Sequence, residues 1–234
     1  MLGLPTTDFL QILLKYTSSL KKIEAEAKEE IKNLSMTKIV ITGSNSEIAK
    51  RFVNLSPYKT EFVFVNSSDI FDHWDADKYF FCQGFLAGQN AADITSEEYD
   101  KTWNSNLFTI VEACDKIINT NERARICIIS SESAYRGSYD TTYAKSKKAI
   151  NTYIEDKKLK FPAQQLVGIA PSIIEDTRMT WNRKDTENIN NKRNSHPMKR
   201  FCYSLEVAEL AFTLLYEQPY INRTVIRMHG GNLE

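Results

Sequence analysis

Short apolar segments alternate with longer amphipathic segments along most of this chain. The short segments are rich in Val, Ile and Phe, as buried β-strands are, and they span residues 38–42, 61–65, 78–82, 125–130, 165–169 and 224–228. The longer segments place apolar residues at helical spacing and predict helices over residues 47–55, 96–119, 142–158 and 205–216. Alternation of this kind is typical of parallel strands joined by right-handed crossovers, so we predict an α/β fold with a doubly wound parallel sheet.

The first 35 residues follow a different pattern, in which apolar positions recur at steps of four and three with Lys and Glu between them. These positions are Phe9, Leu13, Tyr16, Leu20, Ile23, Ala27 and Leu34. We therefore predict an amphipathic N-terminal helical extension over residues 1–35 and one folded domain over residues 36–234. Such a stripe is typical of a coiled-coil or partner-binding helix, and equally of a helix that packs on its own domain.

Composition and charge exclude several classes of protein. Basic and acidic residues number 30 each, so the chain has no net charge that would attract a nucleic acid. The four cysteines lie far apart without C-x-x-C spacing; we interpret them as buried free thiols of a reducing compartment and expect no metal. No apolar stretch is long enough to span a membrane, and the apolar run at residues 9–14 lacks the basic flank of a signal peptide. We therefore expect a cytoplasmic protein with no membrane partner.

Two residues one helical turn apart carry the main chemical signal. Tyr143 and Lys147 share one face of the helix predicted over residues 142–158, and Ser131 directly follows the strand before it. A neighbouring ammonium favours the phenolate, so we expect Lys147 to lower the pKa of Tyr143 from its usual value near 10. Such a pair occurs about once by chance in a chain of this composition. Tyr153 and Lys157 form a second pair, interpreted as a packing tyrosine and a solvated lysine.

The turn after the first strand has the composition of a phosphate-binding turn. Gly43 permits a tight bend, and the small residues Ser44, Asn45 and Ser46 let a ligand approach the backbone where the next helix begins. Backbone N–H groups and the helix dipole hold a diphosphate at such a point without a charged side chain. Turns of this composition are common, so the turn indicates a nucleotide only together with other motifs.

Taken in order, these motifs resemble the short-chain dehydrogenase/reductase family over roughly residues 37–232. The resemblance rests on Thr42-Gly43, Ala87-Gly88, Asn106, Ser130-Ser131, Tyr143 with Lys147, Pro171 with Thr177, and the closing His229-Gly230-Gly231. It implies a Rossmann-like sheet and a bound NAD or NADP. The implied cofactor-binding residues are Gly43, Ser44, Asn45, Ser46, Ile48, Asp69, Ala87, Gly88, Tyr143, Lys147, Pro171 and Thr177.

The resemblance also implies roles for four catalytic residues. Tyr143 would exchange a proton with the substrate oxygen, Lys147 would tune that tyrosine and bind the nicotinamide ribose, and Ser131 would polarise the substrate. Asn106 would hold a water in a proton relay to Lys147, or bond the backbone as an ordinary helix residue. Ser130 stays an alternative to Ser131 for this role. The competing role for Ser131 is that of a cap at the end of the strand. Family members commonly pair through the helices bearing Asn106 and Tyr143, which implies a homodimer or homotetramer.

The chain departs from the family pattern at the cofactor end. Glu47 and Ala49 stand where glycines are usual, and Pro171 is followed by Ser172 rather than Gly. The stretch 66–77 is short, so we expect the third strand to be reduced or absent, with Asp69 beside the adenine. No Lys or Arg lies at residues 44–46 or 66–68 to meet a 2′-phosphate, which favours NAD over NADP slightly.

Residues 172–200 combine many basic side chains with little apolar periodicity, which predicts a mobile loop bordering the site. Their basic balance favours a small polar alcohol or ketone that is anionic or sugar-like, with Arg178 as the candidate substrate contact. A merely solvated, charged loop is the competing interpretation. The competing function is a catalytically silent dinucleotide-binding or scaffold protein.

Overall fold

The computed structural model describes residues 17, 36–57, 59–66, 72–87, 93–183 and 185–232. The chain divides into two units, Met1–Met36 and Thr37–Glu234. The helix predicted over residues 1–35 lies outside the described residues apart from Thr17, so the extension stays a prediction.

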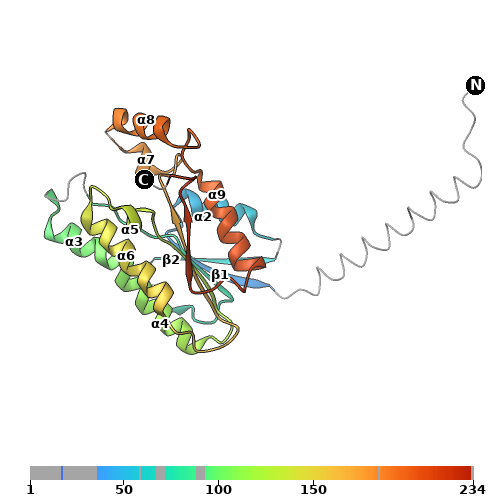
Figure 1. The fold of residues 1–234 in the computed structure, drawn as a ribbon. Helices are drawn as coiled ribbons and strands as arrows, with labels where there is room; N and C mark the ends of the chain where they lie inside the picture. The colour runs from blue at the N-terminus through green and yellow to red at the C-terminus, as the bar shows by residue number, and fades with distance from the viewer. Residues whose placement is uncertain are drawn as a thin grey trace, which may run out of the picture. The chain divides into compact units, whose positions relative to one another are not determined.

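The second unit is built on one parallel sheet of six strands in the order β2-β1-β3-β4-β5-β6 (Figure 1). The strands are β1 (Thr37–Thr42), β2 (Thr60–Val65), β3 (Lys78–Phe81), β4 (Arg125–Ile129), β5 (Gln165–Pro171) and β6 (Thr224–Met228). All seven residues of β5 are buried, as expected for a parallel strand that is covered on both faces. The predicted doubly wound sheet is confirmed. Between β2 and β3, the described residues 72–77 form no strand, in line with the short stretch seen in the sequence.

Helices cover both faces of the sheet (Figure 1). The longer ones are α2 (Glu47–Leu55), α3 (Ser96–Trp103), α4 (Thr109–Thr120), α6 (Thr141–Asp156), α8 (Thr186–Ser195) and α9 (Ser204–Phe212), and the shorter ones are η3 (Asn104–Phe108), α5 (Ser133–Arg136), α7 (Arg178–Trp181) and η4 (Thr213–Glu217). Ile39 and Ile41 of β1 belong to the apolar core under α2 and α9, whereas Val40 belongs to the core under α4 and α6. This alternation follows from the two-residue period of a strand and gives each helical layer its own core.

A π-helical turn interrupts the long helix predicted over residues 96–119. The helix begins with a capping box, in which the Thr95 hydroxyl accepts the Glu98 N–H at 3.2 Å and the Glu98 carboxylate accepts the Thr95 N–H at 3.0 Å. The turn η3 then widens the helix around Asn106, and a second π turn, η4, follows α9. Each π turn directly adjoins an α-helix, so the sequence pattern indicates a helix without showing where such a turn lies.

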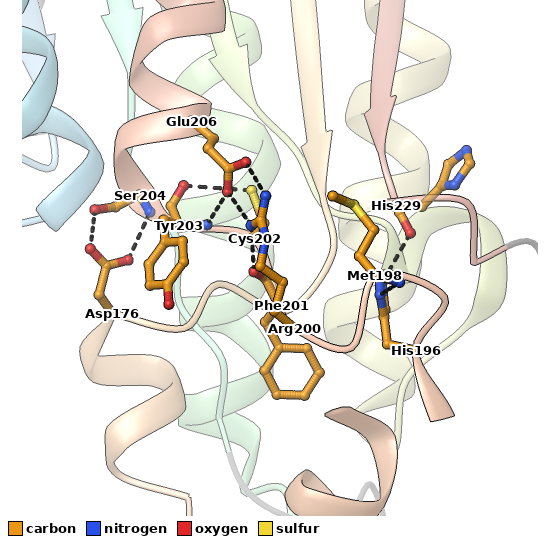
Figure 2. Close-up of polar contacts among 10 residues, drawn as sticks. All are labelled: Asp176, His196, Met198, Arg200, Phe201, Cys202, Tyr203, Ser204, Glu206 and His229. Atoms are coloured by element: carbon orange, nitrogen blue, oxygen red, sulfur yellow. Dashed lines mark hydrogen bonds and ion pairs between the residues drawn. The ribbon is translucent and has the colours of Figure 1, made fainter. Parts of the chain in front are cut away.

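The prediction of a mobile loop over residues 172–200 is wrong, because this segment contains α7 and α8. Ile189 is the buried residue of α8, so the helix has almost no apolar stripe to detect. Polar contacts near both ends of the segment hold it to the start of α9 and to the residue after β6 (Figure 2). The Asp176 carboxylate accepts the N–H and hydroxyl of Ser204 at 2.7 and 2.6 Å, and His196 Nε2 lies 3.2 Å from the His229 carbonyl. In the part of the chain that is described, no helix is both long and apolar enough to cross a membrane.

Candidate active site

The candidate site lies where the carboxyl ends of β1, β3 and β4 meet. Gly43 follows β1 with φ of 66°, a left-handed conformation that favours glycine. A Cβ at this position would lie 2.7 Å from the Cys82 carbonyl carbon and from the Gln83 nitrogen, which follow β3. The two turns therefore pack without room for a side chain at the point where the strand order reverses, which is where α/β sheets bind ligands.

The start of α2 faces this crevice. The Ser46 hydroxyl caps the helix by accepting the Ile48 N–H at 3.2 Å, and the Ser46 N–H donates to the Gly43 carbonyl at 2.8 Å. Ile48 itself is buried in the core, so only its backbone can face a ligand. Glu47, which stands where a glycine is usual in the family, forms an ion pair of 2.6 Å with Lys50, so its charge is balanced locally. The turn can still present backbone dipoles to a diphosphate.

The two serines after β4 have different partners. The Ser130 hydroxyl is buried and donates to Asn151 Oδ1 at 2.5 Å, so it ties the strand to α6. The Ser131 hydroxyl accepts the Ser133 N–H at 3.1 Å and forms a hydrogen bond with the Tyr143 phenol. The structure therefore directs Ser131, not Ser130, to the tyrosine.

Tyr143 and Lys147 lie on one face of α6, as the four-residue spacing predicts. Asp140 caps this helix by accepting the Tyr143 N–H at 2.9 Å, which puts the tyrosine in the first turn. The Lys147 ammonium lies 5.8 Å from the centroid of the Tyr143 ring and donates to the Ile129 carbonyl at 2.9 Å. The lysine side chain is almost fully buried, so it is held against the end of β4.

Burial governs the acid and base properties of this pair. Burial raises the pKa of Tyr143 to about 12, although the hydrogen bond from Ser131 lowers that pKa. The prediction of a lowered tyrosine pKa is therefore wrong in this structure, because desolvation of the phenolate outweighs the stabilisation by its neighbours. Burial also lowers the pKa of Lys147 to about 8. The site thus holds a neutral phenol beside an ammonium that gives up its proton more readily than a solvated lysine.

Asn106 is fully buried at the π turn, and its side chain bonds the backbone. Its Oδ1 accepts the Phe85 N–H at 2.8 Å, and its Nδ2 donates to the Phe85 carbonyl at 2.9 Å and to Ser146 Oγ at 3.1 Å. Ser146 in turn donates to the Tyr143 carbonyl at 2.8 Å. The side chain of Asn106 thus fastens the segment after β3 to α6, and its role in a water relay stays a prediction.

Sequence reasoning missed two residues of this site. A Cβ on Gly84 would lie 3.5 Å from Asn106 Oδ1 and 3.6 Å from Lys147 Nζ, so this exposed glycine keeps the approach to the lysine open. Asp140 is buried and also accepts the Ala87 N–H at 3.3 Å, which joins α6 to the segment after β3. A glycine close after a strand and an Asp three residues before the tyrosine were the available signals.

The remaining predicted positions spread along the segment after β5. Pro171 ends β5, and its carbonyl accepts the Glu132 N–H at 2.9 Å. The Thr177 hydroxyl donates to the Ile174 carbonyl at 3.3 Å, and Arg178 is exposed at the start of α7. Gly88 and Asp69 lie outside the described residues.

Most arginines of residues 172–200 already have carboxylate partners. Arg183 pairs with Asp185, Arg193 with Glu175 and Arg200 with Glu206, at 2.6, 2.6 and 2.7 Å. These guanidinium groups are therefore occupied within the chain. Arg178 has no ion pair with any residue that the structure describes.

The second tyrosine–lysine pair has a structural role. The Tyr153 hydroxyl and the Lys157 ammonium both donate to Asp115 Oδ1 at 2.5 Å, which joins α6 to α4. The prediction that Lys157 is merely solvated is wrong, because an acidic residue 42 positions away in the chain lies next to it.

Comparison with known proteins agrees with this geometry. A sequence model of the short chain dehydrogenase family matches residues 81–188, which include Asn106, Ser131, Tyr143 and Lys147. No curated protein compared with the chain matches it.

Solved structures show the same fold at low sequence identity. A short-chain dehydrogenase/reductase, glucose/ribitol dehydrogenase, from Brucella melitensis is 20% identical with a TM-score of 0.71, covering 85% of this chain and 97% of its own. A short chain dehydrogenase family protein from Francisella tularensis is 19% identical with a TM-score of 0.71, covering 84% of this chain and 98% of its own. A small-chain dehydrogenase in complex with NADPH is 14% identical with a TM-score of 0.73, covering 84% and 98%.

A parallel sheet that brings Ser131, Tyr143 and Lys147 together at its carboxyl edge defines the class of fold as a doubly wound, Rossmann-like α/β sheet. The chain is similar to the short-chain dehydrogenase/reductase family, through the sequence match over residues 81–188 and through the fold that it shares with solved members. The resemblance seen in the sequence is confirmed.

Proposed function

We propose that this chain is an active oxidoreductase that transfers hydride between a nicotinamide cofactor and a small polar alcohol or ketone. The observation that carries the proposal is that Ser131, Tyr143 and Lys147 come together beside the Gly43 turn, in one largely buried site. A phenol with a hydroxyl partner and a buried ammonium suits proton transfer to a reacting oxygen. A protein that only bound a nucleotide would have no chemical need for all three groups.

The residues of the site suit a dinucleotide. Gly43 leaves no side chain between the first turn and the segment after β3, and Ser44, Asn45 and Ser46 would meet the diphosphate at the start of α2. Lys147, open toward Gly84, would hydrogen-bond the nicotinamide ribose. When bound, the nicotinamide supplies or accepts the hydride.

In the direction of reduction, the substrate oxygen lies between the hydroxyls of Ser131 and Tyr143. Ser131 donates a hydrogen bond that polarises the carbonyl, and Tyr143 gives its proton to the oxygen as negative charge develops there. Lys147, with its pKa lowered to about 8, resupplies that proton from the same face of α6. Oxidation follows the reverse path, in which the alcohol proton passes to Tyr143.

A turnover assay distinguishes the catalytic function from a silent, scaffold-like function. Binding is followed through the fluorescence of reduced nicotinamide, and a panel of carbonyl compounds is then assayed with the wild type and with Tyr143→Phe. We expect turnover to fall at least about 100-fold in this variant. Tyr153→Phe is the matched control, because this tyrosine has the same spacing to a lysine on the same helix and should retain activity. Cofactor binding without turnover that depends on Tyr143 would favour the silent function.

The cofactor is proposed to be NAD rather than NADP. The positions that would face a 2′-phosphate carry no positive charge, since they are Ser44, Asn45, Ser46 and Asn66. Solved relatives of the same fold include an actinorhodin polyketide ketoreductase with NADPH, so both cofactors are compared directly. We expect NADH to bind at least about tenfold more tightly than NADPH in fluorescence titrations. The opposite order would reject this preference and leave the oxidoreductase proposal intact.

The substrate is proposed to carry a carboxylate, a phosphate or sugar hydroxyls that contact Arg178. Arg178 supports this proposal because it is exposed and has no ion pair with any described residue. The three other arginines of residues 172–200 are paired with carboxylates. Arg178→Gln should raise KM about tenfold or more for anionic carbonyl compounds and leave KM for neutral ones unchanged. An equal effect on both kinds of compound would reject the contact.

A homodimer or homotetramer is proposed to form through α3, α4 and α6. Tyr99 and Phe108 are 49% and 55% exposed, and with Trp103 they border a hollow of about 340 Å³. Exposed aromatic clusters of this kind are enriched at interfaces. Light scattering should therefore give a multiple of the 26.9 kDa chain mass, and Phe108→Glu should lower it. Tyr220→Glu, at a fully exposed tyrosine, is the control and should leave the measured mass unchanged. A chain that begins at Met36 tests whether residues 1–35 contribute.

A cytoplasmic location is proposed from the four free cysteines, three of which are buried. Unpaired thiols suit a reducing compartment. Cell fractionation with an antibody to the chain tests this location, and recovery from an oxidising compartment would reject it.

A further inference from the structure

Glu132, the residue directly after Ser131, carries a buried carboxylate that the catalytic proposal does not use. It is 5% exposed, and both of its oxygens bond the Arg227 guanidinium, one of them to Nε at 3.1 Å. Such a fork fixes the orientation of both groups as well as balancing their charge. A buried carboxylate without a partner would be strongly unfavourable, so Glu132 depends on this arginine.

Arg227 reaches Glu132 across the sheet. It lies on β6, in register with Ala170 of β5, and β5 separates it from β4. The small side chain of Ala170 leaves room for the arginine to cross β5 on that face. The Tyr135 ring also lies against the guanidinium, with its centroid 4.4 Å from Arg227 Cζ. The ion pair therefore joins the segment after β4 to β6 across β5.

The residues on both sides of Ser131 are anchored to β5. On one side, the Ser130 N–H donates to the Ile169 carbonyl at 2.7 Å. On the other side, the Glu132 N–H donates to the Pro171 carbonyl at 2.9 Å, and the carboxylate is held by Arg227. Ser131 is thus fixed between two anchored residues, with its hydroxyl accepting the Ser133 N–H and meeting the Tyr143 phenol.

We propose that Arg227 is a positioning residue, which acts through Glu132 to hold the Ser131 hydroxyl against Tyr143. The positioning matters for catalysis only if the oxidoreductase proposal is correct, but the contact itself can be measured without substrate or cofactor. The tyrosine ring carbon that bears the hydroxyl, Cζ, has a ¹³C resonance that is sensitive to hydrogen bonding of the phenol. In protein labelled at tyrosine Cζ, the Tyr143 resonance is the one that disappears in Tyr143→Phe.

Ser131→Ala gives the position of the Tyr143 resonance when the hydrogen bond is absent. We expect Arg227→Gln to move the wild-type resonance at least halfway toward that position at neutral pH. Arg200→Gln is the matched control, because it opens another arginine–glutamate fork, with Glu206, at the base of α9 (Figure 2). The control should leave the Tyr143 resonance in place. An unmoved resonance in folded Arg227→Gln would overturn the proposal.

If Arg227→Gln does not fold, the double variant Glu132→Gln/Arg227→Gln removes the buried carboxylate together with the charge of its partner and decides the same question. We expect its Tyr143 resonance also to shift toward the Ser131→Ala position, and a wild-type position would overturn the proposal. With an active substrate, Arg227→Gln should lower kcat about tenfold and leave the KM for cofactor unchanged. A shifted resonance in a protein without any turnover would reject the oxidoreductase proposal and keep the positioning role.

Discussion

At the scale of single residues, the burial of the Lys147 ammonium lowers the stability of the fold. Lys147 is almost fully buried, yet its ammonium has one hydrogen bond to protein in the described structure, to the Ile129 carbonyl. Its pKa of about 8, against 10.5 for a free side chain, corresponds to about 3 kcal/mol of unfavourable burial. The charge of this residue therefore lowers the stability of the folded protein at neutral pH.

Replacing Lys147 by methionine should stabilise the protein at neutral pH. The loss of the bond to Ile129 offsets part of the gain, which leaves roughly 1–2 kcal/mol in favour of Lys147→Met at pH 7. Because the folded pKa is the lower one, the unfolded wild type binds more protons between pH 8 and 10.5, and wild-type stability rises over that range. The advantage of the variant should therefore vanish by about pH 10. Urea unfolding at both pH values measures it, and a variant less stable than wild type at pH 7 would refute this reasoning.

Substitutions at Gly43 and Gly137 distinguish the cost of backbone strain from the cost of close packing. Both have left-handed φ values, 66° and 82°, but a Cβ meets backbone atoms at 2.7 Å at Gly43 and nothing within 4 Å at Gly137. Gly137→Ala should therefore cost about 1 kcal/mol of unfolding free energy, and Gly43→Ala about 3 kcal/mol. Gly43→Ala should also weaken dinucleotide binding, since the two turns of the site must move apart. Chemical denaturation and cofactor titration of both variants check this, and equal losses would contradict it.

At the scale of elements, α8 differs from the other long helices because polar contacts rather than an apolar face hold it in place. Ile189 is its buried residue, so the position of the helix depends on polar anchors such as Arg193 with Glu175 and His196 at its end. The His196 Nδ1 accepts the Met198 N–H at 3.2 Å, which leaves Nε2 to donate to the His229 carbonyl. An element with few apolar contacts opens before the core does.

His196→Ala should loosen α8 without unfolding the sheet. Trypsin, which cleaves after Lys192 and Arg193, should cut the variant at least about tenfold faster than the wild type, because α8 loses its tie to β6. Ser195→Ala is the control, since that hydroxyl bonds only within the helix, to the Lys192 carbonyl at 3.2 Å. Mass spectrometry of the fragments identifies the cleavage sites. Equal rates for all three proteins would show that His196 is not an anchor.

At the scale of the whole molecule, the four thiols report how the core opens. Burial raises the pKa of Cys82, Cys114 and Cys127, and it raises the pKa of the half-buried Cys202 to about 12. A thiol reagent at pH 8 should therefore label Cys202 first, and the other three together at the rate of global unfolding. Labelling followed by mass spectrometry measures the order. Early reaction of one buried cysteine would reveal local opening of its layer.

The sheet could be predicted because its signals are local. The helix over residues 47–55 and the strand over residues 224–228 have the predicted bounds, since each has a dense apolar pattern between clear breaks. Ser131, Tyr143 and Lys147 could be found because strand end and helix face set their spacing. By contrast, Gly84, Asp140 and Arg227 act through contacts between distant segments, and α8 has too few apolar residues to show a period.

The bond between Glu132 and Arg227 joins residues 95 positions apart in the chain. It can form only after β5 has been laid down between β4 and β6, because the arginine crosses that strand. Long-range contacts of this kind close late, since a large loop must be ordered first. Catalytic competence should therefore be among the last properties to return on refolding, after compaction and helix formation are complete.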